Sequence, residues 1–177
     1  MMPRQLFSET ELAEVNNAVL LAEEMVCNYY KMSANQWLRH RYDVKTQAEL
    51  ADEEIVSGPY AQIVRYAGRR QGSSLGSLTF DFYKICLQDE AILKTIRKNP
   101  EVAAFPFLLY LIVHELIHIV RFAKFYQQFN APAEERQKEE EMVHDITRTI
   151  LRSHDIAGMP EVLAVCFGQA QVTDSIC

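Results

Sequence analysis

The stretch IVHELIHIV, residues 112–120, places two histidines and a glutamate in a segment that is otherwise entirely aliphatic. It belongs to an apolar run from about residue 102 to 128, whose length is that of a helix and exceeds that of a strand. Asn130-Ala131-Pro132 ends that run. Burying a polar side chain without a partner costs about 2 kcal/mol or more. The stretch therefore predicts a buried helix in which something satisfies three polar groups together.

The spacing of these polar residues is that of a metal site. His114 and His118 are four residues apart, so on a helix their imidazoles leave the same face and can share one tetrahedral cation. Glu115 lies about 100° around the axis, where it can reach a water on the metal without being a ligand. A single buried histidine would more often be held by hydrogen bonds alone. Two histidines and a glutamate on one apolar helix favour a cation instead.

A second motif follows in EEEMVHD, residues 139–145. Together with HELIH, residues 114–118, it resembles the gluzincin metallopeptidases, the thermolysin-like group of the zincins. In that group the H-E-x-x-H helix is followed by a helix that carries a glutamate ligand and an aspartate four residues later. The resemblance implies an α+β, zincin-like domain in which a small antiparallel or mixed sheet packs against the active-site helix and the glutamate helix.

The same resemblance implies one Zn²⁺ per chain, held by His114, His118 and Glu141. It implies that Asp145 does not bind the metal but orients one of the ligand histidines. It also implies a zinc-dependent metallopeptidase, a hydrolase acting on peptide or protein substrates, with Glu115 as the catalytic base that takes a proton from water. The donors that would stabilise the oxyanion remain open among three side chains, those of Tyr110, Arg148 and His154.

The third ligand is not fixed by the sequence. The side chains of Glu139 and Glu140 compete with Glu141, and His144 is an alternative metal ligand. The metzincin subgroup is excluded, because Arg121 stands where its extended motif requires glycine.

Two other classes of protein are compatible with these sequence motifs. One is a non-catalytic metal-binding or interaction protein on a zincin scaffold. The other is a di-iron carboxylate oxidoreductase, since the chain contains two E-x-x-H pairs, at residues 115–118 and 141–144, and Glu23 or Glu24 could add a further ligand. The short separation of the two pairs leaves no room for the helix that normally lies between them in such bundles.

The remaining chain predicts a mixture of helices and strands. The strand-like segment SLTFDFYKICLQD alternates Leu78, Phe80 and Phe82 with Thr79, Asp81 and Tyr83, and by the zincin resemblance it is a candidate edge strand for substrate, or else a core strand. The other expected elements are helices at 9–32, 90–98 and 133–153, short helical turns at 35–40 and 46–53, a strand within 60–68, a loop at 71–77, and a short helix after residue 158.

Composition limits the class of protein. The 177 residues suit a single domain over 1–177, and the net charge of −6 without a cluster of Lys and Arg argues against a nucleic-acid partner. The polar residues inside the longest apolar run argue against a membrane partner. Four scattered cysteines and a start without an apolar signal core predict a reduced, cytoplasmic protein. Oligomeric state is not indicated.

Overall fold

The computed structural model describes residues 4–69, 79–124 and 128–168. They form six α-helices, two short 3-10 turns and three strands, which confirms the α+β class and the small mixed sheet. The helices are α1 Glu9–Tyr29, α2 Ala34–Trp37, α3 Asp89–Lys98, α4 Ala104–Ala123, α5 Ala133–Arg152 and α6 Met159–Gly168; the strands are β1 Tyr42–Lys45, β2 Ala61–Arg69 and β3 Thr79–Leu87; the 3-10 turns are Gln47–Glu49 and Asp52–Glu54.

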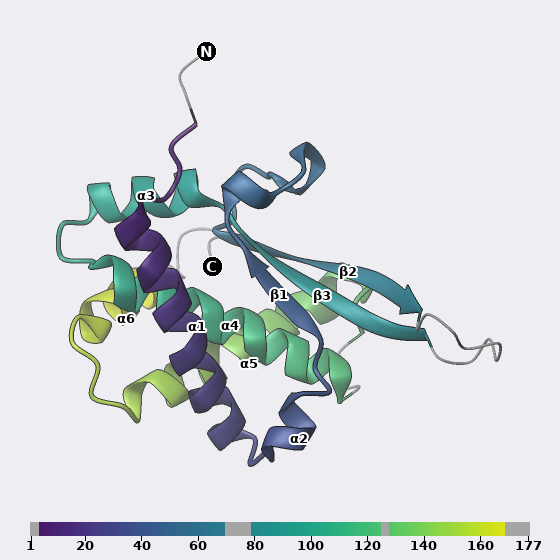
Figure 1. Ribbon diagram of the computed structural model, residues 1–177. Helices are drawn as coiled ribbons and strands as arrows, with labels where there is room; N and C mark the ends of the chain where they lie inside the picture. Colours follow the sequence, from purple (N-terminus) through teal and green to yellow (C-terminus); the bar gives the residue numbers. More distant parts are fainter. Residues whose placement is uncertain (1–3, 70–78, 125–127, 169–177) are drawn as a thin grey trace.

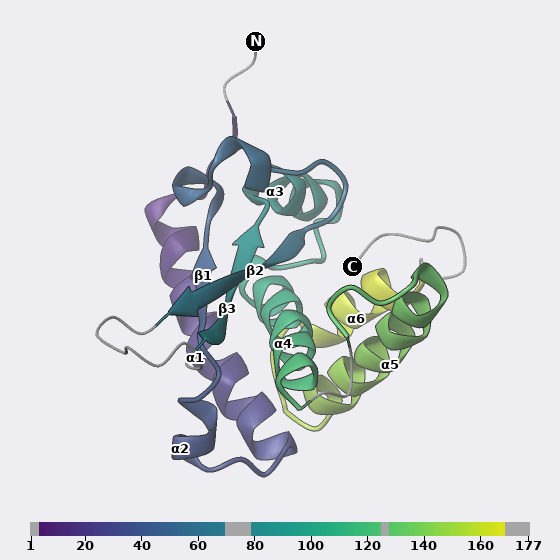
Figure 2. The same ribbon diagram turned by 90° about the vertical axis from the view of Figure 1, so that its right-hand side faces the viewer.

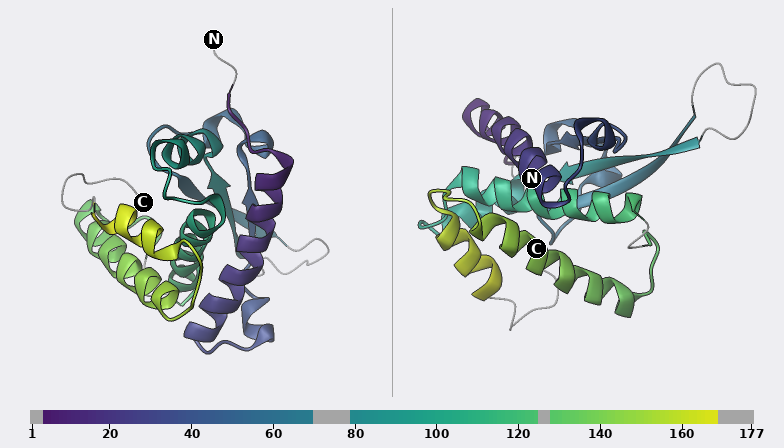
Figure 3. Two further views of the ribbon diagram at one scale, coloured as in Figure 1. Left: turned by 90° about the vertical axis from the view of Figure 1, so that its left-hand side faces the viewer. Right: turned by 90° about the horizontal axis from the view of Figure 1, so that it is seen from below.

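Helix α4 is the centre of the fold. Fifteen of its twenty residues are buried, because aliphatic side chains occupy every face of the helix except the polar stripe that contains the histidines. The sheet and α1 lie on one side of α4, while α5 and α6 lie on the other (Figures 1 and 2). The same order of layers appears from the opposite side and from below (Figure 3). By length and composition α4 could span a membrane, but 83% of its most apolar 18-residue window is buried inside the protein.

The sheet has the strand order β1-β3-β2, with β3 parallel to β1 and antiparallel to β2. Strand β3 is therefore central and hydrogen-bonded on both sides, so of the two alternatives left open for this segment the core strand is confirmed and the edge strand is excluded. Among the side chains of β3 that are described, Tyr83, Ile85 and Leu87 are buried, whereas Phe82, from the apolar set of the alternating pattern, is only half-buried.

Local sequence accounts for the start of α1. The Ser8 backbone N–H donates to the Glu11 carboxylate at 2.6 Å, and the Glu11 N–H donates to the Ser8 hydroxyl at 3.3 Å. This reciprocal capping box satisfies two donors that a helix start leaves unpaired. It fixes the beginning of a helix that packs along α4.

Most predicted elements are found within a few residues of their expected bounds, including the helical turns after residue 33. Strand β1 was not predicted; it lies between those turns and joins β3 in parallel, outside the two segments in which strands were expected. The expected loop at 71–77 lies outside the described residues.

Candidate metal centre

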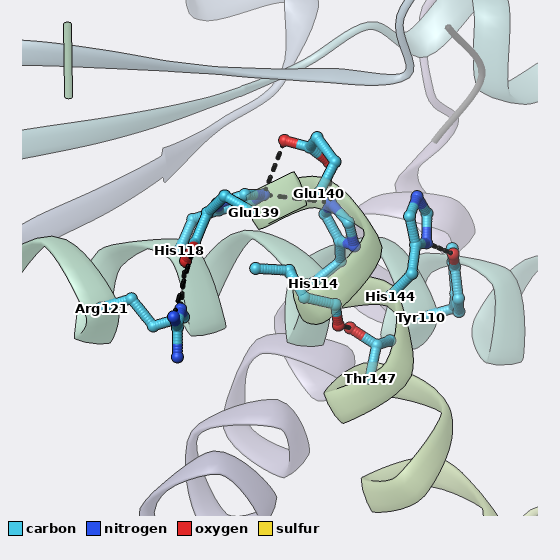
Figure 4. Close-up of polar contacts among 9 residues, drawn as sticks. Tyr110, His114, His118, Arg121, Glu139, Glu140, His144 and Thr147 are labelled. Atoms are coloured by element: carbon cyan, nitrogen blue, oxygen red, sulfur yellow. Dashed lines mark hydrogen bonds and ion pairs between the residues drawn. The ribbon is translucent and has the colours of Figure 1, made fainter. Parts of the chain in front are cut away.

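Three side chains meet between α4 and α5. His114 and His118 lie one turn apart on α4, and their Nε2 atoms are 3.3 Å from each other. The Glu140 carboxylate of α5 reaches both rings: one oxygen lies 3.3 Å from Nε2 of His114 and the other 3.0 Å from Nε2 of His118 (Figure 4). The ligand atoms of this group all lie within 4.8 Å of one another and could hold a metal ion.

These separations fit a small cation. With ligand bonds of about 2.0 to 2.2 Å, two donors on a tetrahedral Zn²⁺ lie about 3.3 to 3.6 Å apart. The His114–His118 and His114–Glu140 separations of 3.3 Å match that edge length, and the His118–Glu140 separation of 3.0 Å is slightly shorter. The donor set of two imidazoles and one carboxylate is also one that zinc uses. A cation therefore fits here with only small side-chain movements.

The group is buried on one side and open on the other. His114 and His118 are 3% and 5% exposed, whereas the Glu140 side chain is 44% exposed. The imidazoles are thus buried, with the rings of Tyr110, Phe122 and His144 as neighbours, while the carboxylate of Glu140 is partly exposed to solvent. A cation held here would keep a position accessible to water or a ligand, which distinguishes catalytic from structural zinc sites.

Burial and mutual contact set the charge state of the group. Burial lowers the pKa of His114 to about 4, against the opposing effect of its hydrogen bond to Glu140. Burial alone would raise the pKa of Glu140, but hydrogen bonds from the two imidazoles outweigh it and hold that pKa well below its ordinary value. Near neutral pH the site therefore contains a neutral His114 and an ionised Glu140, the protonation states that metal ligands require.

Glu115, the glutamate of the H-E-x-x-H motif, lies half-buried next to this group. Burial raises its pKa to about 7, while the charge of His118 lowers it and that of Glu140 raises it further. Glu115 is therefore close enough to the site for the charges of His118 and Glu140 to shift its pKa. It does not belong to the group of possible ligands.

The structure brings Glu140, and not Glu141, to the histidines. One residue rotates a helix by about 100°, and the Glu141 side chain is exposed to solvent. Asp145, one turn further along α5, shares that outer face: its side chain is 69% exposed and pairs with Arg148 at 2.6 Å. The predicted ligand role of Glu141 and the predicted supporting role of Asp145 do not fit this geometry.

His114 also lacks the support that Asp145 was predicted to give. Its Nδ1 atom is buried and has no hydrogen-bond partner among the described residues. In metal sites this second nitrogen commonly donates to a carbonyl or carboxylate. No such acceptor is present for His114 in the described part of the chain.

His144 occupies a place beside the group. Its ring centroid lies 4.7 Å from that of His114, and its Nδ1 is 3.0 Å from the Tyr110 hydroxyl. Tyr110 is fully buried on α4, one turn before His114. His144 does not belong to the set of atoms that could hold one ion. The Tyr110–His144 pair therefore extends the polar stripe between the helices without joining the candidate ligands.

The other glutamate of the acidic run has a separate partner. Glu139 forms a buried ion pair with Arg121, which lies three residues after His118 on α4. Three contacts join the helices: Arg121 with Glu139, His118 with Glu140, and Tyr110 with His144 (Figure 4). In this order the residue numbers fall along α4 and rise along α5. Together they define an antiparallel register with a continuous polar seam.

The other sequence candidates lie elsewhere. Of the possible oxyanion donors, His154 is exposed and Arg148 pairs with Asp145, which leaves Tyr110 as the one in the polar seam. The di-iron ligand set is not assembled in the described residues, because Glu141 is exposed and Glu23 of α1 accepts a hydrogen bond from Tyr42.

Comparison with known proteins gives no identification. No family model, no curated protein and no solved structure matches this chain.

Proposed function

We propose that this protein is a zinc-dependent peptidase whose metal is held by His114, His118 and Glu140. The observation that carries the proposal is the convergence of two buried imidazole Nε2 atoms, 3.3 Å apart, on one ionised carboxylate, whose two oxygens lie 3.3 and 3.0 Å from them. The order of the motifs, H-E-x-x-H on one helix and a glutamate on the antiparallel helix that follows, supports a zincin-like arrangement.

A divalent cation held by these three residues would supply polarisation of a substrate carbonyl and a lowered pKa of bound water. The side chains then divide the work. His114, His118 and Glu140 hold the cation, and Glu115 accepts the proton of the attacking water and later delivers it to the leaving amine. Glu115 suits this role because it lies beside the ligands without being one of them.

The Tyr110–His144 pair is positioned to assist. When the Tyr110 hydroxyl donates to Nδ1 of His144, the ring proton is on Nε2, which makes that atom a hydrogen-bond donor. A donor next to His114 can stabilise negative charge that develops on a carbonyl oxygen near the cation. In this role His144 acts on the substrate and does not bind the metal.

Substrate binding is assigned to the sheet edge near the helices. Strand β2 is an edge strand that contacts α4, and its outer backbone groups can pair with an extended peptide. In this proposal β2 has the substrate-pairing role for which the segment of β3 was a candidate in the sequence. Pairing along β2 would add the peptide as a further strand beside β2, the edge strand that contacts α4.

The test compares Glu115→Gln with wild-type protein that contains one zinc per chain. We expect the variant to retain zinc and to lose hydrolysis of a fluorogenic peptide library by about 100-fold or more. Glu141→Gln makes the same chemical change at the exposed position on α5 and should retain both properties.

Each contrary result has a definite meaning. Wild-type protein that binds zinc but cleaves no peptide in the library would overturn the peptidase and leave the non-catalytic metal-binding protein. Equal activity of wild type and Glu115→Gln would remove Glu115 from the mechanism. Protein that binds no zinc would overturn the whole proposal.

A further inference from the structure

A second site lies on the other side of the molecule, where α1, α2 and β1 meet (Figure 1). These elements line an open cavity of about 330 Å³, a size that accommodates a small organic molecule. The residues that give it chemical character are Glu23, Trp37, His40, Tyr42 and Asp43. None of them belongs to the candidate metal centre, which is built from α4 and α5.

Three rings line this cavity. The Trp37 ring centroid lies 5.6 Å from that of His40 and 5.9 Å from that of Tyr42, both in edge-to-face arrangement. Trp37 and Tyr42 are half-buried and so present part of their surface to the cavity. Aromatic faces attract cations through the negative charge density above the ring, and indole does so most strongly.

The charged groups of the lining have one sign. Glu23 and Asp43 contribute carboxylates, and no lysine or arginine belongs to the lining of this cavity. Burial, and after it the positive charge of Lys124, which is outside the lining, lowers the pKa of His40, so the imidazole is neutral at pH 7. Glu23 accepts a hydrogen bond from the Tyr42 hydroxyl, which fixes its carboxylate at the wall. Asp43 lies 3.4 Å from Lys45, so its charge is shared and Glu23 is the main anionic group.

We propose that this cavity binds small organic ammonium ions. The combination of aromatic rings with a fixed carboxylate is the chemistry that recognises alkylated ammonium groups. An anionic ligand would meet the carboxylates of Glu23 and Asp43, of which only Asp43 has a cation, Lys45, beside it. A purely apolar ligand would have to desolvate Glu23 without replacing the lost water contacts. The inference does not depend on the peptidase proposal, because the two sites share no residue.

The chain provides its own reporter, since Trp37 is the only tryptophan. Choline chloride is titrated at constant ionic strength while tryptophan fluorescence is recorded, and its neutral carbon isostere dimethylbutanol is titrated in parallel. We expect saturable quenching by choline with a dissociation constant of about 1 mM or lower, and at least about tenfold weaker binding of the neutral isostere.

Variants then locate the charge. Glu23→Gln keeps an acceptor for Tyr42 but removes the negative charge, and it should weaken choline binding about tenfold. Glu24→Gln removes the neighbouring charge on α1, outside the lining of the cavity, and should leave binding unchanged. Circular dichroism and urea unfolding of each variant establish that the fold is retained. His114→Ala should also bind choline normally.

A third probe distinguishes two sources of the ammonium group. The amide of N-acetyl-lysine carries a primary ammonium on a peptide-like unit; quenching by it at lower concentration than by choline would indicate a protein lysine as the natural occupant. Absence of saturable quenching by either cation overturns the proposal. Equal quenching by choline and its neutral isostere does so as well, since it would mean that charge plays no part.

Discussion

Arg121 and Glu139 form an ion pair across the α4–α5 interface, and both side chains are only 11% exposed. This pair lies beside the candidate metal centre, since Glu139 precedes Glu140 and Arg121 follows His118 by three residues. Two charges at this depth constrain how the helices can slide or rotate, because any other register would leave one of them buried alone. The pair thus helps to hold Glu140 against the histidines.

Breaking the pair should destabilise the protein strongly. We expect Arg121→Met to lower the free energy of unfolding by about 3 kcal/mol, because it leaves the Glu139 carboxylate without its buried partner. Urea denaturation in the presence of a chelator measures this without a contribution from bound metal. Arg121→Met combined with Glu139→Leu should recover most of the loss.

A matched control is available on the same helix. Lys138 and Glu134 form an ion pair with side chains 73% and 84% exposed, so Lys138→Met should change the free energy of unfolding by no more than about 0.5 kcal/mol. Equal losses for Arg121→Met and Lys138→Met would show that burial of the Arg121–Glu139 pair has no energetic consequence.

The choice of Glu140 as third ligand can be tested against its neighbour. Glu140→Gln should weaken zinc binding by about 100-fold or more, because it removes the charge of a group that binds the metal directly. Loss of a residue that only supports a ligand already costs about 10- to 100-fold in affinity. Glu141→Gln should leave affinity unchanged, because that side chain is exposed. Competition against a chromophoric chelator measures both. A larger effect at Glu141 would restore the ligand set implied by the sequence resemblance.

The site shows what helical spacing can and cannot predict. His114 and His118 are placed by the four-residue repeat within one helix, so their convergence followed from the sequence alone. The third ligand comes from another helix, and its identity depends on the rotation of α5 about its own axis. The four candidates for the third ligand lie within six residues of α5, and the rotation of the helix decides which of them faces the histidines. The apolar pattern offered a signal, since Val143, Thr147, Ile150 and Leu151 are buried on α5 and Glu140 belongs to the same side of the helix.

The sheet shows a similar division. The existence of β2 and β3 followed from alternation and β-branched residues, but the strand order did not, because β1 has only four residues and joins β3 from a segment that reads as polar turns. A short edge strand gains its stability from pairing with its neighbour, which no local pattern records. This is why the sequence left open whether β3 is an edge strand or a core strand, and only the pairing with β1 places it in the centre.

His144 separates two roles that the sequence left open. If His144 donates to the substrate and does not bind the cation, His144→Ala should lower kcat of peptide hydrolysis by about 100-fold. Zinc affinity, measured by chelator competition, should then remain within about twofold of wild type. Tyr110→Phe removes the hydroxyl that orients His144 and should reduce kcat in the same direction with unchanged zinc affinity. A loss of zinc affinity in His144→Ala comparable to that in Glu140→Gln would instead make His144 a ligand.

Glu54 provides a pH-dependent contribution to stability far from the metal centre. Hydrogen bonds from Lys84 at 2.7 Å and Tyr66 at 2.5 Å lower the pKa of Glu54 from 4.5 to about 2. Because the folded pKa lies below the unfolded one, the contribution is fully present above about pH 5 and is lost as pH falls toward 2. Glu54→Gln should therefore lower the urea midpoint at pH 7 and have a smaller effect at pH 3. Glu53→Gln, at an exposed position, should show no such dependence.

Metal removal should weaken the fold through the α4–α5 interface. A ligand that binds only the folded protein adds about 2.7 kcal/mol of stability at a free concentration 100 times its dissociation constant, so a chelator should lower the Tm of zinc-loaded protein by several degrees. A cation held by His114, His118 and Glu140 would join α4 to α5, and its removal would leave the contact of Glu140 with the histidines to hydrogen bonds alone. In the variant with both His114→Ala and His118→Ala, zinc and chelator should have no effect on Tm. A shift of equal size in this double variant would mean that the stabilising zinc binds elsewhere in the chain.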